Sequence, residues 1–318
     1  MKAPGFWRKN GFLQEILLPF SVFYFFYLRI KSFFIKPEKL SVPIICVGNA
    51  VVGGAGKTPV AIAIAKLLRK KKVAFVSRGY KGKLKGPVKV DLNTHTVKEV
   101  GDEPFLLAKT APCWVAKNRL EGAIAAIDDG AKILIFDDGL QNLSIIKDIS
   151  ILVIDSSYRF GNAMLFPAGP LRDRLDKTFS LSDCCVLLGE ETDASFSDQL
   201  KSKLPVINAK FISSAKWAPE GKEFVAFAGI GQPEKFFLTL RQYGTNIVET
   251  VSFSDHYFFS KKDMRSLTEK AQKHGARLVT TEKDAVRLPQ DFKENISVFP
   301  VEIAWQDEDK IKDLLSKI

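Results

Sequence analysis

The chain has 318 residues, which at about 150 residues per domain suggests about two domains, or one large domain with an extension. Hydrophobic residues make up 46% and charged residues 26%, an ordinary globular composition that excludes a disordered tail protein, a collagen and a coiled coil. The net charge of +11 favours an anionic partner such as phosphate, nucleic acid or an acidic membrane face. Four cysteines without C-x-x-C spacing and three histidines argue against a disulfide framework, a zinc site and a His-rich metal site.

Residues 1–40 contain an aromatic, apolar segment with basic flanks that begin at Arg8 and Lys9 and resume at Arg29. Pro19 and Arg29 interrupt the apolar run, which is shorter than the roughly 20 residues of a spanning helix. No small-residue cleavage site follows, which disfavours a signal peptide. Aromatic residues with basic neighbours favour a helix in the membrane interface. A helix buried on the domain core and a spanning helix are the alternatives.

Short apolar runs alternate with helical stretches across residues 41–221. Alternating strands and helices indicate βαβ units, and continuously apolar strands indicate a mainly parallel sheet buried on both faces. The predicted strands are Ile44–Val47, Val73–Val76, Cys113–Ala116, Ile133–Phe136, Ile151–Ile154 and Cys185–Leu188, and the predicted helices are Thr58–Lys70 and Asn118–Asp129.

A polar stretch with Pro and Gly at residues 213–223 predicts a domain boundary. A second α/β pattern follows, and we predict a smaller domain over residues 222–318 that contributes to the active-site cleft. Its predicted strands are Phe224–Ala228, Ile247–Phe253 and Arg277–Thr280, and its predicted helices are Pro233–Tyr243 and Lys261–His274.

Residues 48–58, Gly-Asn-Ala-Val-Val-Gly-Gly-Ala-Gly-Lys-Thr, lie between a predicted strand and a predicted helix, the context of a phosphate-binding loop. Lys57 is predicted to reach the β- and γ-phosphates and the Thr58 hydroxyl to bind Mg²⁺. The spacing is irregular, because Val51 occupies the position of the usual first Gly. A tight glycine turn with a surface lysine is the alternative.

Several acids and one histidine are further candidates. Asp137 and Asp138 end an apolar strand downstream of the loop, where acids can hold Mg²⁺ directly or through water. Asp102 and Glu103 lie in a turn before a helix. His256 lies beside an acid and aromatic residues, although a lone histidine is more often structural.

Basic residues are concentrated in residues 69–89, which hold nine Lys or Arg and no acid. This stretch is either a solvated face or a surface for anionic lipid or a phosphorylated substrate. Within this stretch, Arg78 follows a predicted strand, and it either faces the candidate nucleotide site or is a solvated loop charge. Aromatic residues are sparse here, so we expect no nucleic-acid partner, and we predict no obligate protein partner.

The motifs together resemble the tetraacyldisaccharide 4′-kinase family, the lipid A 4′-kinases of Gram-negative bacteria. The resemblance covers residues 44–288 in the family's order, and the apolar N-terminal segment also matches the family's membrane-associated helix. The irregular loop spacing is the family's own. The matching stretches are residues 47–49 and 53–59, 77–80, 101–104, 137–141, 166–172, 255–257 and 281–285.

The resemblance implies an α/β fold of the P-loop NTPase type and transfer of the ATP γ-phosphate to the 4′-hydroxyl of a tetraacylated glucosamine disaccharide 1-phosphate. This reaction would take place at the cytoplasmic face of the bacterial inner membrane and would use Mg²⁺. By position, Asp102 with His256 would accept the proton, Lys57 and Asp138 would also serve catalysis, and Thr58, Glu103 and Asp138 would hold the metal. The implied nucleotide-binding residues are Asn49, Gly53, Gly54, Ala55, Gly56, Lys57, Thr58, Asp137 and Gln141, and the implied substrate residues are Arg78, Arg172 and Asp173.

Three positions depart from the family pattern. Asn142 stands where the family usually has His, Lys147 where Arg is frequent, and Asp173 where Glu is common. The first change affects a secondary contact, and the last shortens a carboxylate by one methylene.

Two other functions fit parts of the sequence. The first is a P-loop GTPase or ATPase that acts as a switch or assembly factor. A GTPase would need a guanine-binding signature, and residues 281–284, Thr-Glu-Lys-Asp, match such a signature only loosely. A purely structural membrane-bound protein leaves Asp102, Asp137 and Asp138 without a role.

Overall fold

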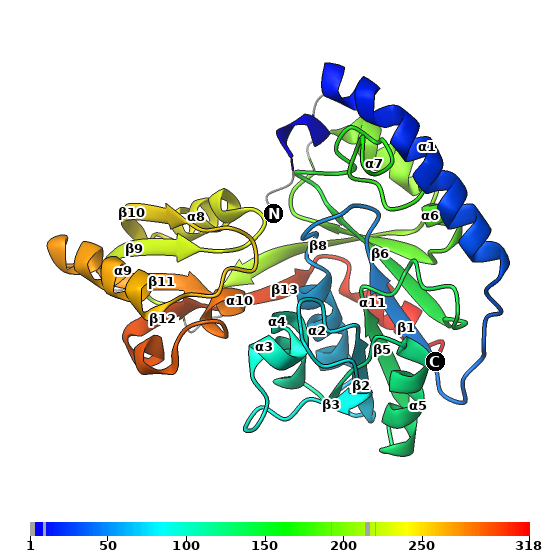
Figure 1. Cartoon of the computed structure of the whole chain (residues 1–318), viewed down its shortest axis with the longest axis horizontal. Helices are drawn as coiled ribbons and strands as arrows, with labels where there is room; N and C mark the ends of the chain where they lie inside the picture. The colour runs from blue at the N-terminus through cyan, green and yellow to red at the C-terminus, as the bar shows by residue number, and fades with distance from the viewer. Residues whose placement is uncertain (1–3, 9–10, 192, 214–216, 220) are drawn as a thin grey trace. The chain divides into compact units, whose positions relative to one another are not determined.

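A computed structural model describes residues 4–8, 11–191, 193–213, 217–219 and 221–318. Lys9 of the basic flank and residues 214–216 and 220 of the predicted domain boundary lie outside the described residues. The chain forms two compact units (Figure 1), and the smaller one is Ile212–Glu302. The larger unit combines the described chain up to Phe211 with Ile303–Ile318. The smaller unit thus begins before the predicted start at residue 222. It ends at Glu302 because the C-terminal residues return to the larger unit.

The larger unit is built on a sheet of nine strands within the described residues, in the order β13-β8-β7-β6-β1-β5-β2-β4-β3. Neighbouring strands from β8 to β4 run parallel, and β3 pairs antiparallel with β4. The strands are β1 Ile44–Gly48, β2 Val73–Ser77, β3 Val88–Lys89, β4 Cys113–Val115, β5 Ile133–Asp137, β6 Ile149–Asp155, β7 Cys184–Leu188, β8 Val206–Ser213 and β13 Val301–Trp305.

Helices cover both faces of this sheet, and its central strands β1, β2, β5 and β6 are mostly apolar and buried at every position. In β1, Ile45 packs in a cluster with Ile64 of α2, whereas Ile44 packs in a second cluster with Ala123 of α5. The predicted α/β fold with a mainly parallel sheet is therefore confirmed. The helices of this unit are η1 Gly5–Trp7, α1 Phe12–Phe33, α2 Lys57–Leu67, α3 Val97–Val100, α4 Asp102–Ala108, α5 Arg119–Asp128, α6 Leu175–Ser180, α7 Ala194–Lys201 and α11 Glu308–Leu315.

The smaller unit has a parallel sheet of four strands within the described residues, in the order β10-β9-β11-β12. Phe227 packs with Met264 of α9 on one face, and Phe224 packs with Phe237 of α8 on the other. The elements are β9 Glu223–Ala228, α8 Pro233–Gln242, β10 Asn246–Ser252, α9 Lys261–Lys273, β11 Arg277–Thr281, α10 Glu282–Ala285, η2 Gln290–Asn295 and β12 Ile296–Phe299.

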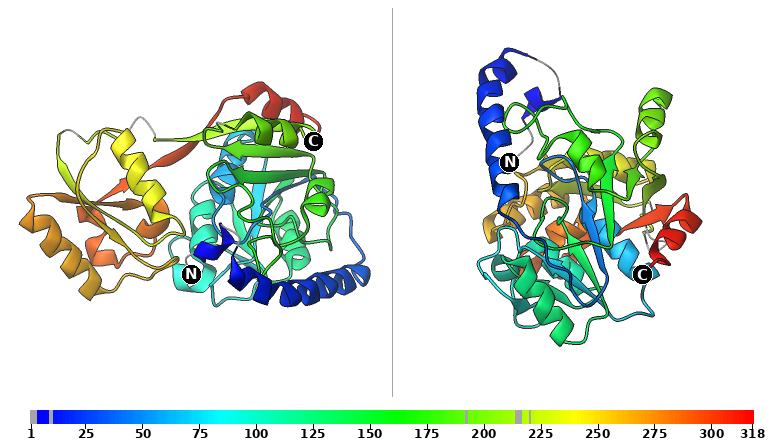
Figure 2. Two further views of the ribbon diagram at one scale, coloured as in Figure 1. Left: turned by 90° about the horizontal axis from the view of Figure 1, so that it is seen from above. Right: turned by 90° about the vertical axis from the view of Figure 1, so that its right-hand side faces the viewer.

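Helix α1 lies along the outside of the larger unit in both Figure 1 and Figure 2. Its buried residues are the polar Gln14 and Ser21, whereas its large apolar side chains, such as Phe23 at 73% exposure, face outward. The alternative of a helix buried on the core is therefore wrong. The helix continues through Pro19, and by length and composition alone it is long and apolar enough to cross a membrane.

Candidate active site

The loop between β1 and α2 requires glycine where its backbone turns. Gly53 and Gly56 have φ angles of +120° and +82°, a region that side chains disfavour. A Cβ at Gly56 would also approach Leu188 Cδ1 to 2.5 Å. Gly56 is the N-cap of α2, so the loop presents backbone N–H groups at a helix N-terminus, where anions bind.

The Lys57 side chain crosses this loop instead of extending into solvent. Its Nζ lies 3.1 Å from Asn49 Oδ1 and 3.5 Å from Asp138 Oδ1. Asn49 Nδ2 donates to the Val51 carbonyl oxygen at 2.8 Å, and Gln141 Nε2 donates to the Asn49 carbonyl oxygen at 2.9 Å. The surface-lysine alternative is therefore wrong, since Lys57 is buried within the loop.

Asp137 ends β5 with one carboxylate oxygen engaged and one buried without a bond. Thr58 Oγ1 donates to Oδ2 at 2.9 Å. Oδ1 has no hydrogen-bond partner among the residues that the structure describes. Burial, followed by the neighbouring negative charge of Glu103, raises the pKa of Asp137 to about 7, although Lys57 opposes the shift. The positive charge of Lys57 therefore compensates this carboxylate only in part.

Asp138, the next residue, is surrounded by cations. Arg172 Nη1 contacts both of its carboxylate oxygens, at 2.9 and 3.0 Å. Burial opposes ionisation, but Lys57 and Arg172 together hold the pKa of Asp138 well below its usual range. Arg119 Nη2 donates to the Asp138 carbonyl oxygen at 2.6 Å, and the backbone there has a φ of +57°. Two adjacent acids thus have opposite electrostatic environments.

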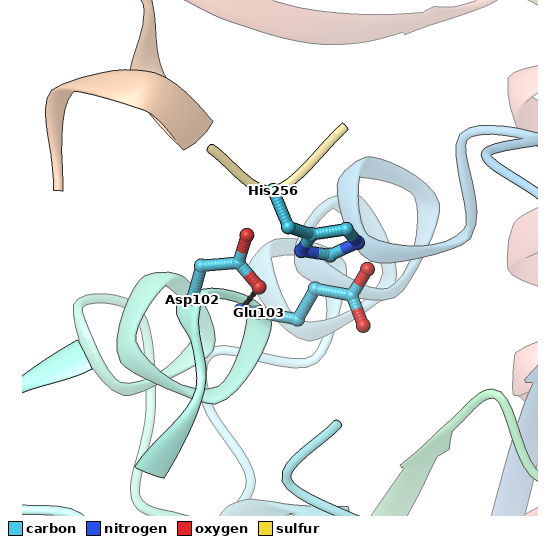
Figure 3. A group of neighbouring side chains, drawn as sticks. All are labelled: Asp102, Glu103 and His256. Atoms are coloured by element: carbon cyan, nitrogen blue, oxygen red, sulfur yellow. Dashed lines mark hydrogen bonds between the residues drawn. The ribbon is translucent and has the colours of Figure 1, made fainter. Parts of the chain in front are cut away.

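Asp102 and Glu103 lie in the first turn of α4 (Figure 3), immediately after Gly101. The Glu103 backbone N–H donates to Asp102 Oδ1 at 3.0 Å, shown as the dashed line in Figure 3. The effect of Glu103 on the pKa of Asp137 indicates that the two carboxylates are neighbours. The helix start therefore places Glu103 near the acid pair.

The three predicted substrate residues have different environments. Arg172 is engaged with Asp138 and, through Nε, with the Val51 carbonyl oxygen at 3.0 Å. Asp173 is buried and its Oδ2 lies 2.7 Å from Lys177 Nζ. Arg78 is exposed at the end of β2. Of the three, Arg78 has the side chain most accessible to a ligand.

Sequence reasoning missed Arg119. Burial, opposed by the charge of Asp138, lowers the pKa of its guanidinium. A signal was present, since Arg119 follows the N-cap Asn118 at a strand-to-helix junction on the carboxyl edge of the sheet.

The departures Asn142 and Lys147 have local roles in the turn after β5. Asn142 Oδ1 accepts from the Ser144 N–H at 2.9 Å. Lys147 Nζ donates to the carbonyl oxygens of Leu140, at 3.1 Å, and Asn142. Both side chains therefore stabilise the turn that carries Gln141.

In the smaller unit, His256 lies in the loop after β10 with a φ of +59°. Its backbone N–H donates to the Gly229 carbonyl oxygen at 2.9 Å, and its Nε2 lies 3.8 Å from Asp255 Oδ2. The loop after β9 thus supports the histidine backbone.

A fully buried ion pair, Asp284 with Arg287, lies beneath these two loops. Arg287 Nη2 lies 3.1 Å from Asp284 Oδ1, and both side chains are 0% exposed. Asp284 Oδ1 accepts from the Gly229 N–H at 3.0 Å, and Arg287 Nη1 donates to the carbonyl oxygens of Gly229 and Tyr257 at 3.0 and 3.3 Å. Because Asp284 Oδ2 also binds the Thr281 hydroxyl at 2.7 Å, this carboxylate is not available to read a guanine base.

A mainly parallel sheet carrying this loop, with its lysine and threonine facing an acid pair at the end of the neighbouring strand, defines a protein of the P-loop NTPase class. A family model described as LpxK, tetraacyldisaccharide-1-P 4′-kinase, matches residues 13–318. The chain belongs to this family, as the sequence motifs predicted.

Individual relatives agree with the family match. The chain is 40% identical over 324 residues to the tetraacyldisaccharide 4′-kinase of Rhodospirillum rubrum, covering 100% of this chain and 98% of the relative. It is 44% identical over 299 residues to that of Parvibaculum lavamentivorans, covering 91% and 87% of the two chains.

A solved structure supports the fold assignment. It is described as the "apo" form of LpxK from Aquifex aeolicus in complex with ATP, and it matches with a TM-score of 0.78 and 28% identity over 96% of this chain and 99% of the other. The predicted P-loop kinase fold is confirmed, and the protein is a kinase of the tetraacyldisaccharide 4′-kinase family.

Replacing Arg287 with Met should lower the free energy of unfolding by about 3–5 kcal/mol, because it leaves the Asp284 carboxylate buried without its cation. Urea denaturation of the intact chain measures the effect. Arg265→Met, which removes an exposed arginine of α9, is the matched control and should change stability by less than about 0.5 kcal/mol. Equal stability of the two variants would contradict the structural role of the pair.

Proposed function

We propose that the protein transfers the γ-phosphate of ATP to the 4′-hydroxyl of tetraacyldisaccharide 1-phosphate and forms the bisphosphorylated lipid A precursor, lipid IVA. The observation that carries this proposal is the buried Lys57, held between Asn49 and an acid pair at the end of the adjacent strand. The relatives, which are tetraacyldisaccharide 4′-kinases, support the substrate assignment. The reaction takes place at the cytoplasmic face of the inner membrane, where a lipid substrate is accessible.

The phosphate loop binds the ATP phosphates. Its backbone N–H groups and the α2 N-terminus attract the anionic oxygens, and Lys57 adds a full positive charge. Asn49 and Gln141 hold the loop in shape through their hydrogen bonds. The loop residues in this role are Gly53, Gly54, Ala55, Gly56, Lys57 and Thr58.

Mg²⁺ fits the oxygen groups of Thr58, Glu103 and Asp137. The buried, unbonded Oδ1 of Asp137 and the neighbouring negative charge of Glu103 support this assignment. It revises the expected ligand set, since the Asp138 carboxylate is engaged by Arg172. When bound, the ion supplies neutralisation of the charge on the transferring phosphoryl group. Asp138 instead orients Lys57 and Arg172.

Asp102 and His256 accept the proton of the attacking hydroxyl. The placement of Asp102 beside Glu103, together with the family motifs, supports this role. The two residues belong to different compact units.

On the substrate side, Arg78 and the basic residues around it attract the anionic disaccharide phosphate. The exposure of the Arg78 side chain supports this assignment, whereas the Arg172 guanidinium is already bound to Asp138. Asp173 acts through Lys177, its ion-pair partner.

The outward face of α1 attaches the protein to the bilayer. Its exposed apolar residues match a lipid environment, and basic residues at its ends match an anionic leaflet. The exposed apolar residues are Phe12, Leu13, Ile16, Leu18, Phe20, Val22, Phe23, Phe26, Tyr27, Ile30 and Phe33.

Lys57→Ala and Asp102→Ala should each lower phosphate transfer at least about 100-fold, because they remove charge stabilisation and the proton acceptor. The assay combines ATP, Mg²⁺ and the disaccharide lipid in detergent and measures a second phosphate on the lipid. Lys203→Ala and Asp198→Ala remove exposed groups and are the controls. Near-normal transfer by the Lys57 or Asp102 variant would defeat that residue's assignment.

The double substitution Phe23→Asp and Phe26→Asp should reduce co-sedimentation with anionic liposomes, because two carboxylates replace apolar contacts on the lipid face. Binding of ATP by the double variant in solution should be retained. Leu238→Asp changes an exposed apolar residue of α8 and serves as the control. Undiminished sedimentation of the double variant would argue against attachment through α1.

A further inference from the structure

Helix α1 buries a serine against one segment of the chain, residues 165–172, which we call the linking segment. Ser21 is 4% exposed. Its Oγ donates to the Leu165 carbonyl oxygen at 2.9 Å and accepts from the Ala168 N–H at 3.1 Å. A hydroxyl that satisfies two buried backbone groups of a distant segment fixes the position of that segment relative to the helix.

Aromatic residues extend this contact at both ends of the linking segment. Tyr24 donates its hydroxyl to the Arg172 carbonyl oxygen at 3.1 Å, and Trp7 Nε1 donates to the Pro167 carbonyl oxygen at 3.0 Å. The Phe166 ring packs edge-on against Trp7 and Tyr24, with centroids 6.1 and 5.7 Å apart. The segment is therefore bound to the N-terminal region along its length.

The linking segment also binds the phosphate loop. The Val52 N–H donates to the Pro170 carbonyl oxygen at 2.7 Å, and the Arg172 N–H donates to the Ala50 carbonyl oxygen at 2.9 Å. Arg172 Nε adds a bond to the Val51 carbonyl oxygen at 3.0 Å. Backbone groups in the first half of the loop are thus satisfied by the linking segment instead of by regular secondary structure.

Arg172 completes a continuous path from α1 to the acid pair. Its backbone carbonyl accepts from Tyr24, and its guanidinium holds both oxygens of Asp138. The tip of the loop has open surroundings, since a Cβ placed on Gly53 or Gly54 would meet no atom within 4 Å in the described part of the chain. No neighbouring atoms therefore hold the tip in place from outside. A glycine-rich loop with open surroundings gains its shape from the contacts at its base.

We propose that α1 is a positioning element of the nucleotide site and that Ser21 and Tyr24 are positioning residues that act through the linking segment. They fix the first half of the phosphate loop and the Arg172 guanidinium. This inference rests on the proposed function only in assigning the phosphate loop to ATP. Attachment to a bilayer uses the outward apolar face of α1, whereas Ser21 and Tyr24 point to the linking segment, so the two roles are separable by substitution.

The test compares Ser21→Ala and Tyr24→Phe with Ser32→Ala. The Ser32 hydroxyl donates to the Arg29 carbonyl oxygen within α1, at 2.8 Å, so its removal leaves the linking segment untouched. Calorimetry of the intact protein in detergent measures ATP affinity with Mg²⁺ present. We expect Ser21→Ala and Tyr24→Phe to weaken ATP binding about two- to tenfold, the effect of losing one or two hydrogen bonds. Ser32→Ala should bind ATP as the unmodified protein does.

Two further readouts separate positioning from general damage. Co-sedimentation with anionic liposomes and the thermal midpoint of Tyr24→Phe should match those of the unmodified protein, because its ring and the outward face of α1 are retained. Unmodified ATP affinity in both Ser21→Ala and Tyr24→Phe would overturn the inference, and so would weaker ATP binding that occurs only with loss of thermal stability. Failure of the unmodified protein to bind ATP would instead contradict the proposed role of the phosphate loop.

Discussion

A buried strand that ends in two adjacent carboxylates imposes the main constraint on this molecule. Neighbouring cations stabilise the charge of Asp138, namely Lys57, Arg172 and, at its backbone, Arg119. Asp137 has only the Thr58 hydroxyl and a lysine at longer range, so burial raises its pKa to about 7. Under the proposed function, this asymmetry gives the two acids different tasks: Asp138 orders the basic groups around the phosphates, and Asp137 has an oxygen available for a cation.

Much of the larger unit could be predicted from its sequence because its central strands are mostly apolar and its loop has an unusual glycine pattern. The strands β1, β2 and β5 were predicted to within one residue of their observed ends. The strands β8 and β13 were missed, since polar residues such as Asn208 and Lys210 interrupt their apolar pattern. The return of Ile303–Ile318 to the larger unit was missed because a tertiary contact across the sheet has no local signal.

The candidate site was predictable in composition but not in its pairings. The motifs identified Lys57, Asp137 and Asp138. The ion pair of Arg172 with Asp138 could not be predicted, because the two residues are far apart in the sequence and become neighbours only in the folded chain. The same holds for Ser21, a polar residue in an apolar helix, and for Asp284, which resembled a base-reading acid but lies buried against Arg287. In each case the sequence shows the polar residue without identifying its buried partner.

The most direct test of the charge asymmetry is the affinity of Mn²⁺, a spectroscopic substitute for Mg²⁺, for the ATP-bound protein, measured by electron paramagnetic resonance in Asp137→Asn and Asp138→Asn. The account predicts that Asp137→Asn weakens Mn²⁺ binding at least about tenfold, a change of about 1.4 kcal/mol, and that Asp138→Asn has a smaller effect. Mn²⁺ binding that is retained in Asp137→Asn and lost in Asp138→Asn would contradict the division of roles between the two acids.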